Sequence, residues 1–337
     1  MRSDTLTLPT DAMRRAMAAA PLGDDVFGED PTVNRLQEMA AERLGKEAAI
    51  LVSSGTMGNL IGLLVHARRG QEVIAEADAH VFFYEAAGAA VVGGIQIRPV
   101  PTGAGVMSSE QVRDSIRPVD DAHQPTTAAV AVENTHNRHG GVAWPAQTLR
   151  EVSAMAHGHG IAVHMDGARI FNAALATAMP PAELAACADT VTFCLSKGLG
   201  CPVGSVLCGS AEMIASAHRW RKLLGGGMRQ AGVIAAAGVV ALEEMVDRLA
   251  EDHANARTLA EALSELDGLS CDLWRVQTNI VIVRVAAMDA ARFVEECRGR
   301  GLLVAAMGGD RVRFVTRYGI DAADVQAAIR IVTQVLN

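Results

Sequence analysis

Two charged residues stand directly after apolar, strand-like runs in the middle of the chain. Asp166 follows Ile161–Met165, and Lys197 follows Thr190–Leu195 in a turn between Ser and Gly. In an open parallel sheet, ligands bind at the carboxyl ends of the strands. A carboxylate there could keep a pyridine nitrogen protonated, and an amine could form a Schiff base. A surface ion pair for Asp166 and a solvated Lys197 are the alternatives. A solvated surface position is a poor explanation for a lysine that has small neighbours and comes directly after a buried strand.

The segment Ser54-Gly-Thr56 is a candidate anion site. It follows the apolar run Ala48–Val52 and leads into a predicted helix that ends near Arg68. Backbone N–H groups and the dipole at a helix start bind anions, although an ordinary capped helix has the same sequence features. A phosphate loop, a carboxylate and a lysine in this chain order indicate an enzyme that uses pyridoxal 5'-phosphate (PLP), with Lys197 as its anchor.

Composition argues against several other classes of protein. The 337 residues are 50% hydrophobic and 20% charged, with a net charge of −8 and a pI of about 5.7. An acidic chain without a run of Lys and Arg does not fit a nucleic acid or an anionic membrane as partner. No stretch reaches the roughly 18 apolar residues of a membrane span. Asp4, Pro9 and Asp11 interrupt any signal peptide, so the cytoplasm is the expected compartment.

Three patterns that suggest other sites fit structural explanations better. The glycines of Gly198–Gly204 imitate a dinucleotide fingerprint, but the third comes one place late and no ribose-binding acid follows. His157-Gly-His159 fits the end of a helix better than a metal site. Four cysteines recur every seven residues from Cys187 to Cys208, whereas zinc ligands usually come in pairs roughly two to four residues apart. We therefore predict reduced thiols and no metal.

Strand-like runs alternate with helical patterns over the first two thirds of the chain. The runs are Ala48–Val52, Glu72–Ala75, Ile95–Pro99, Thr127–Glu133, Ile161–Met165, Thr190–Leu195 and Ser205–Cys208. Continuous apolar strands separated by helices indicate a mainly parallel sheet covered on both faces. We predict an α/β large domain over residues 1–245 on a mainly parallel seven-stranded sheet, with residues 1–30 mostly irregular.

The pattern changes near residue 245. Two long helical stretches, about Arg229–Val246 and Asp247–Asp267, are followed by strand-like Asn279–Val285 and Val312–Val315. Helical patterns lie near 289–300 and after residue 321. These features predict a smaller C-terminal α+β domain over residues 246–337.

Several motifs in the same order resemble those of the low-specificity L-threonine aldolases, a PLP-dependent family with the aspartate-aminotransferase-like fold (fold type I). The resemblance covers about residues 1–320. It rests on Arg2-Ser-Asp-Thr5, Gly23-Asp-Asp-Val-Phe-Gly-Glu-Asp-Pro-Thr-Val33, Ser54-Gly-Thr-Met-Gly-Asn59, Glu133-Asn-Thr-His-Asn137, His164-Met-Asp-Gly-Ala-Arg169, Ser196-Lys-Gly-Leu-Gly-Cys-Pro-Val-Gly204 and Leu224-Gly-Gly-Gly-Met-Arg-Gln230.

The resemblance implies a role at the cofactor for each matching residue. Lys197 would carry PLP, Asp166 would pair with the pyridinium nitrogen, and His80 would stack on the ring. The backbone of Gly55 and Thr56 would hold the phosphate.

On the substrate side, the resemblance implies that Ser3, Arg169 and Arg313 grip the carboxylate. Arg169 would also border the cofactor, and His136 would lie near the substrate hydroxyl. The Gly-rich stretch that ends at Arg229 would reach the cofactor of a neighbouring subunit, which predicts a homo-oligomer, as a dimer or a dimer of dimers.

Alternatives remain for several of these residues. Arg169 could pair with Asp166 instead of the substrate, and His80 could cap a helix. Glu85 could assist His80 or face solvent. Strand alternation puts Arg311 on the same face as Arg313, and only the family pattern favours Arg313.

One departure from the family is visible near the C-terminus. Val315-Thr316 is followed by Arg317, where the family commonly has His. The larger charged side chain could alter substrate preference or the entry channel, or belong to plain surface.

The implied reaction is the reversible cleavage of L-threonine, L-allo-threonine and related β-hydroxy-α-amino acids to glycine and an aldehyde. The base would be His136, His80 or a water that they orient, because a neutral imidazole suits proton transfer near neutral pH. The main alternative is a related PLP lyase that prefers aryl-serines or catalyses β-elimination. A PLP-fold regulator would need a DNA-binding segment, and a nucleotide-dependent oxidoreductase lacks its fingerprint here.

Overall fold

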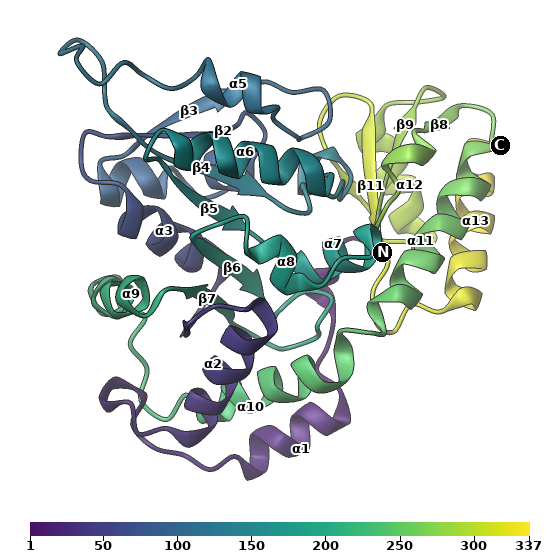
Figure 1. The fold of residues 1–337 in the computed structure, drawn as a ribbon. Helices are drawn as coiled ribbons and strands as arrows, with labels where there is room; N and C mark the ends of the chain where they lie inside the picture. Colours follow the sequence, from purple (N-terminus) through teal and green to yellow (C-terminus); the bar gives the residue numbers. More distant parts are fainter.

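The computed structural model describes residues 1–337 and contains two β-sheets (Figure 1). The larger sheet has seven strands in the order β1-β7-β6-β5-β4-β2-β3. Only β7 runs antiparallel to its neighbours. The strands are β1 (Ala48–Val52), β2 (Glu72–Glu76), β3 (Gln96–Val100), β4 (Thr127–Glu133), β5 (Ala162–Asp166), β6 (Thr190–Cys194) and β7 (Ser205–Gly209). The predicted mainly parallel seven-stranded sheet is confirmed.

Helices cover both faces of this sheet, which is why its inner strands are buried along their whole length. β2 and β6 are buried at every residue. One face packs against α3 (Gly55–His66) and α9 (Ala211–Leu223). The other face packs against α2 (Pro31–Leu44) and α6 (Ala146–Gly158), with α7 (Ile170–Thr177) and α8 (Pro181–Ala185) beside them in the main core.

The N-terminal segment is more regular than predicted. We expected residues 1–30 to be mostly irregular, but Asp11–Ala19 forms helix α1, which packs against α10 (Gly232–Val240). Thr10 is the N-cap of the helix, and its Oγ1 accepts a hydrogen bond from N of Met13 at 3.2 Å. Met13 is the one buried residue of α1. Met17, one turn later, also packs against the core, so the helical spacing is present in the sequence.

The other helical segments around the larger sheet are short, and several of them carry predicted site residues. They are the 3-10 turns Asp4–Leu6, Asp25–Phe27 and Asn137–His139, the π-helical turns Ala89–Gly93 and Ala241–Met245, and the helices α4 (His80–Phe83) and α5 (Ser109–Arg113).

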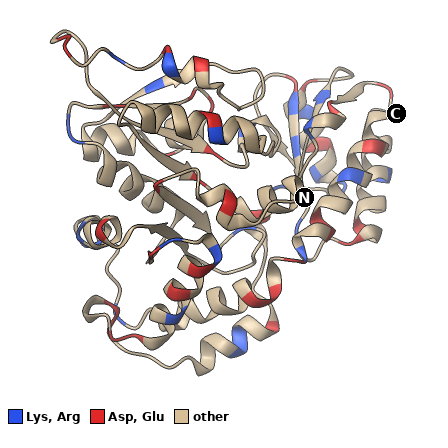
Figure 2. Cartoon of the chain, in the orientation of Figure 1, with Lys and Arg blue, Asp and Glu red and all other residues tan.

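The smaller sheet is antiparallel, in the order β10-β11-β9-β8. Its strands are β8 (Leu269–Cys271), β9 (Ile280–Val285), β10 (Ala305–Ala306) and β11 (Arg311–Val315). One face packs against α11 (Leu249–Ser264), α12 (Ala290–Gly299) and α13 (Ala322–Leu336), and a 3-10 turn lies at Leu273–Arg275. Figure 2 shows basic residues gathered on β9 and β11, among them Arg284, Arg311 and Arg313.

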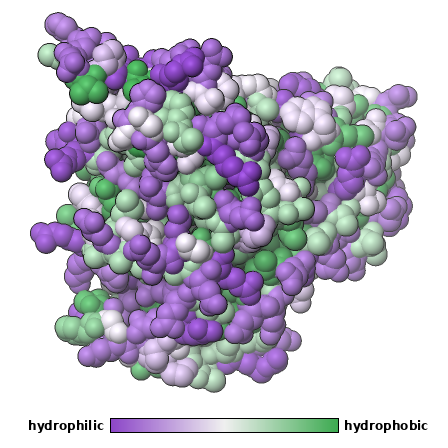
Figure 3. Space-filling model, viewed as in Figure 1, coloured by the Kyte–Doolittle hydropathy of each residue, from purple (hydrophilic) through white to green (hydrophobic).

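The surface mixes polar and apolar side chains (Figure 3). No helix has both the length and the apolar character needed to cross a membrane.

Candidate active site

The candidate residues gather at one edge of the larger sheet. β1, β2, β4, β5 and β6 run in the same direction, so their carboxyl ends lie together. Gly55 follows β1, His80 follows β2, His136 follows β4, Arg169 follows β5 and Lys197 follows β6. The topology brings together segments that are far apart in the chain.

Lys197 is the only lysine at this edge. The chain has two others. Lys46 precedes β1, at the opposite edge of the sheet, and donates to the carbonyl of Ala188 at 2.6 Å. Lys222 is exposed in the last turn of α9. Counting lysines is therefore a sequence-level signal that strengthens the prediction for Lys197.

Asp166 is buried and held by two donors. Its Oδ1 accepts from N of Ala168 at 3.0 Å, and its Oδ2 accepts from Nδ2 of Asn59 at 2.8 Å. The same Nδ2 donates to Oε1 of Glu85 at 2.8 Å. Asn59 is not among the site residues predicted from the sequence. A polar residue on the buried face of the apolar helix α3 was the signal that could have found it.

His80 and Glu85 form a pair beside Asp166. Nδ1 of His80 lies 2.7 Å from Oε1 of Glu85, and N of His80 donates to Glu133 at 2.7 Å. Burial disfavours the charged imidazole, but the hydrogen bond to Glu85 and the negative charge of Asp166 raise the pKa of His80 overall. Glu85 is buried against His80, so the structure favours assistance to His80 over a solvent-facing role.

Arg169 pairs with Asp4 and not with Asp166. Its Nε and Nη2 donate to the two carboxylate oxygens of Asp4 at 2.7 and 2.8 Å, and both side chains are buried. Burial opposes ionisation of Asp4, but Arg169 and, more weakly, Lys197 hold the pKa of that carboxyl well below its usual range. The sequence did not indicate this pair, because its members are 165 residues apart.

Arg313 is close to Arg169 in space. Its pKa is lowered, first by burial and next by the positive charge of Arg169. Nη1 donates to Oδ1 of Asn137 at 2.9 Å, while the buried Nε has no partner. The buried Nε of Arg313 therefore leaves a donor that could bind a carboxylate.

Three other residues were considered for the substrate side of the site. Ser3 caps the turn Asp4–Leu6, and its Oγ lies 2.7 Å from that of Thr5. Arg311 instead lines a cavity with Arg275 and Arg284. Arg317 donates to the carbonyl of Tyr318 at 2.8 Å.

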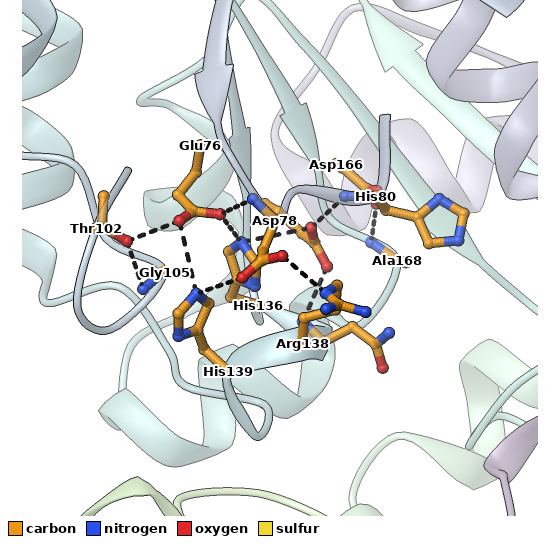
Figure 4. Close-up of polar contacts among 12 residues, drawn as sticks. Glu76, Asp78, His80, Thr102, Gly105, His136, Arg138, His139, Asp166 and Ala168 are labelled. Atoms are coloured by element: carbon orange, nitrogen blue, oxygen red, sulfur yellow. Dashed lines mark hydrogen bonds and ion pairs between the residues drawn. The ribbon is translucent and has the colours of Figure 1, made fainter. Parts of the chain in front are cut away.

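His136 lies inside a buried polar cluster that we call the Glu76 cluster, comprising Glu76, Asp78, His136 and His139 (Figure 4). Nε2 of His136 lies 2.9 Å from Oε2 of Glu76, and the imidazole is fully buried. The structure therefore places His136 after the predicted strand but gives its ring no open path to a substrate.

The Glu76 cluster has residue types that bind metals, but its hydrogen-bond pattern fits protonated side chains better than metal ligands. Metal-bound imidazoles usually donate their second N–H to an acceptor. Nδ1 of His139 lies 3.4 Å from Nη1 of Arg275, which can only donate. Nδ1 of His136 is buried without a partner. Neither ring is supported as a metal ligand would be.

The predicted anion site is the start of α3. Ser54 caps the helix, and its Oγ accepts from N of Met57 at 3.2 Å. A Cβ on Gly55 would lie 2.8 Å from Sγ of Cys194, so the close packing of this turn on β6 requires glycine. Arg229 is half exposed and pairs with Asp24 of the same chain at 2.9 Å. Its reach to a neighbouring subunit stays a prediction.

Comparison with known proteins identifies the family of the chain. The family model described as beta-eliminating lyase matches residues 1–288. A low specificity L-threonine aldolase of Escherichia coli K12 is 47% identical, over 95% of this chain and 94% of its own length. A probable low-specificity L-threonine aldolase 2 of Arabidopsis thaliana is 44% identical, over 97% and 94%. The chain belongs to the beta-eliminating lyase family, with the low-specificity L-threonine aldolases.

Solved structures agree on the fold of the family. The chain matches a Leishmania major threonine aldolase with a TM-score of 0.85 and 18% identity, over 100% of this chain and 99% of that one. It also matches a putative aromatic amino acid beta-eliminating lyase/threonine aldolase of Exiguobacterium sp. 255-15, with a TM-score of 0.81 and 20% identity, over 98% of each chain. The predicted aspartate-aminotransferase-like fold is confirmed.

Proposed function

We propose that this protein is a PLP-dependent aldolase that cleaves L-threonine, L-allo-threonine and related β-hydroxy-α-amino acids to glycine and an aldehyde. The observation that carries the proposal is the position of Lys197. It is the one lysine at the carboxyl edge of the sheet, where the buried carboxylate of Asp166 ends the neighbouring strand. Membership of the threonine aldolases supports the reaction.

The residues at this edge fit PLP. Lys197 offers the amine, Asp166 a carboxylate for the pyridine nitrogen, and the start of α3 free N–H groups at Gly55 and Thr56 for the phosphate. His80, beside Asp166, would cover one face of the ring. Bound there, PLP supplies an electron sink for the negative charge that remains on the glycine carbon when the Cα–Cβ bond breaks.

The substrate carboxylate would bind between Arg169 and Arg313. Asp4 fixes Arg169 through two hydrogen bonds, so the guanidinium keeps its orientation without a ligand. A carboxylate held by two fixed groups defines which bond at Cα stands perpendicular to the cofactor ring, and this positioning selects the bond that breaks.

His80 is the better candidate for the base that accepts the β-hydroxyl proton. Its side chain is 29% exposed, whereas that of His136 is 0% exposed. Glu85 lies at Nδ1 and leaves Nε2 free to accept a proton. Because the pKa of His80 is raised, its neutral, proton-accepting form is reached at higher pH than in an ordinary histidine, and the rate should rise with pH.

A second candidate is a lyase with a preference for aryl-serines. The observation that favours it is a set of exposed aromatic residues next to His80, at Phe82, Phe83 and Tyr84. The ring centroids of His80 and Tyr84 are 5.6 Å apart. An aryl group on the substrate would find aromatic partners there.

The test compares purified wild type with Lys197→Ala, and with Lys222→Ala as a matched control. Wild type and Lys222→Ala should absorb in the visible range with PLP and release glycine and aldehyde from both threonine diastereomers. Lys197→Ala should do neither. Phenylserine tests the second candidate. Release of 2-oxo acid and ammonia instead of glycine would overturn the aldolase reaction.

We further propose a homo-oligomer in the cytoplasm, at least a dimer, in which Arg229 helps to bind the cofactor phosphate of the neighbour. Arg229 is half exposed and lies after the Gly-rich stretch 225–227. Light scattering should show a dimer or tetramer. A monomer that keeps PLP at all concentrations would contradict this.

A further inference from the structure

A chain of hydrogen bonds runs behind Asp166, across α3, β5 and β6. Nε2 of His66 lies 2.8 Å from Oγ1 of Thr190, which lies 2.9 Å from Nδ1 of His164. Nε2 of His164 lies 3.2 Å from Oδ1 of Asn59. The amide of Asn59 then donates to Asp166 and to Glu85.

Donor and acceptor roles in this chain are determined from its far end. Carboxylates accept, so Asn59 presents its NH2 group to them and its Oδ1 to His164. An amide oxygen can only accept, so Nε2 of His164 carries the proton. His164 is fully buried, which lowers its pKa to about 3 and keeps the ring neutral. Nδ1 is therefore bare and accepts from the hydroxyl of Thr190.

Packing fixes the imidazole of His164 in this place. A Cβ on Gly62 of α3 would lie 2.3 Å from Cε1 of His164, so the helix approaches the ring directly. His164 pairs with Thr190 across the β5–β6 register, as Asp166 does with Thr192. The ring cannot leave this series of hydrogen bonds without displacing α3.

The amide of Asn59 cannot pass a proton along this series of hydrogen bonds. The hydrogen bonds can therefore orient and polarise Asp166, but they cannot conduct protons to it.

We propose that His164, an Nε2–H tautomer whose ring Thr190 holds through Nδ1, is a positioning residue that orients Asn59 and through it the carboxylate of Asp166. The proposal rests on the PLP function proposed above. Without the Thr190 hydroxyl, the buried Nδ1 of His164 loses its donor, and the ring is fixed only by its hydrogen bond from Nε2 to Oδ1 of Asn59. The amide of Asn59 is then oriented less firmly, and its hydrogen bond to Asp166 weakens.

The experiment compares Thr190→Val with Thr192→Val. Thr192 is two residues further along β6, is also buried, and its Oγ1 has no hydrogen-bond partner, so the same substitution there removes no bond. Three measurements are made on each protein: the tautomer of His164 by ¹⁵N NMR without cofactor, the Kd for PLP, and kcat and KM for L-threonine. Thr190→Ser restores the hydroxyl and serves as the rescue.

We expect wild type and both valine variants to show the Nε2–H tautomer, with the ¹⁵N shift of Nδ1 in Thr190→Val moved toward that of a nitrogen without a hydrogen bond. For Thr190→Val we expect PLP affinity and kcat to fall about tenfold, the equivalent of one hydrogen bond, with KM within about twofold. Thr190→Ser should recover most of both.

Two results would overturn the proposal: an Nδ1–H tautomer of His164 in wild type, or equal kcat and Kd in the two valine variants. The NMR result on wild type holds even if Thr190→Val fails to fold. Failure of wild type to bind PLP would instead refute the proposed function, since the tautomer is measured without cofactor.

Discussion

Two histidine–glutamate pairs lie side by side at the carboxyl ends of β2 and β4, and they are chemically alike. His80 is 2.7 Å from Glu85, and His136 is 2.9 Å from Glu76. Burial opposes the charge of both imidazoles, yet neighbouring carboxylates raise the pKa of both. They differ in access, because the His80 side chain is 29% exposed and that of His136 is 0% exposed. A perturbed pKa therefore does not separate a reactive histidine from a structural one.

The difference in access comes from a loop after β3. A Cβ on Gly105, which has a φ of +79°, would lie 2.6 Å from Cγ of His136, so the loop closes directly over the ring. Thr102 holds the loop in place: its Oγ1 donates to Glu76 at 2.9 Å and accepts from N of Gly105 at 2.8 Å. No such loop covers His80.

The largest expected effect is on His80. His80→Phe keeps a flat ring to stack on the cofactor but removes the proton acceptor, so kcat should fall by roughly 10²- to 10⁴-fold. PLP binding should stay close to wild type, whereas the buried Glu85 loses its partner and the thermal midpoint should fall. Steady-state cleavage of L-threonine measures this. A kcat within threefold of wild type would show that another group takes the proton.

Glu76→Ala should affect stability before catalysis. The substitution leaves His136 buried beside Glu133 without its main partner, at a cost of about 3 kcal/mol in the free energy of unfolding. Urea unfolding measures that cost. The folded fraction, assayed at low temperature, should keep kcat within about threefold. A large loss of kcat at unchanged stability would place His136 in the reaction instead.

The Glu76–His136 pair should also give the stability a specific pH dependence. The hydrogen bonds of His136 and His139 outweigh burial and hold the pKa of Glu76 well below its usual 4.5, so its contribution is present above that pH and is lost below it. The raised pKa of His136 gives a contribution that is complete below 6.5 and is lost as the pH rises through the folded-state pKa. The stability difference between wild type and Glu76→Gln should therefore be largest, about 2 kcal/mol, between those limits. A difference that stays constant with pH would argue against an ion pair.

The smallest expected effect is on the pH profile of catalysis. Glu85 raises the pKa of His80, so Glu85→Gln should lower it and move the acid limb of kcat to lower pH. Glu76→Gln is the control and should leave the limb in place. A limb that stays fixed in Glu85→Gln, or moves in Glu76→Gln, would assign the titration to a different group.

The sequence predicted the parts of the site that depend on local order. Asp166, Lys197 and Gly55 each follow a strand whose apolar run can be recognised, and the parallel sheet brings them together. Alternation along β11 correctly put Arg311 and Arg313 on one face, but only the fold shows that Arg313 reaches Asn137 beside Arg169.

The remaining features depend on contacts between distant segments, which spacing cannot encode. Asp4 meets Arg169 across 165 residues, and Asn59 meets Asp166 across 107. Gly105 covers His136 from a loop between two strands. These contacts decide which of the predicted side chains can reach a ligand.

The most direct test of the account is to fix the bound cofactor with borohydride and locate it by peptide mass spectrometry. Because the chain has three lysines, the result has few outcomes. The account predicts the pyridoxyl mass on the peptide that contains Lys197 and on no other. Labelling of Lys46 or Lys222, or no labelling of protein that cleaves threonine, would contradict it.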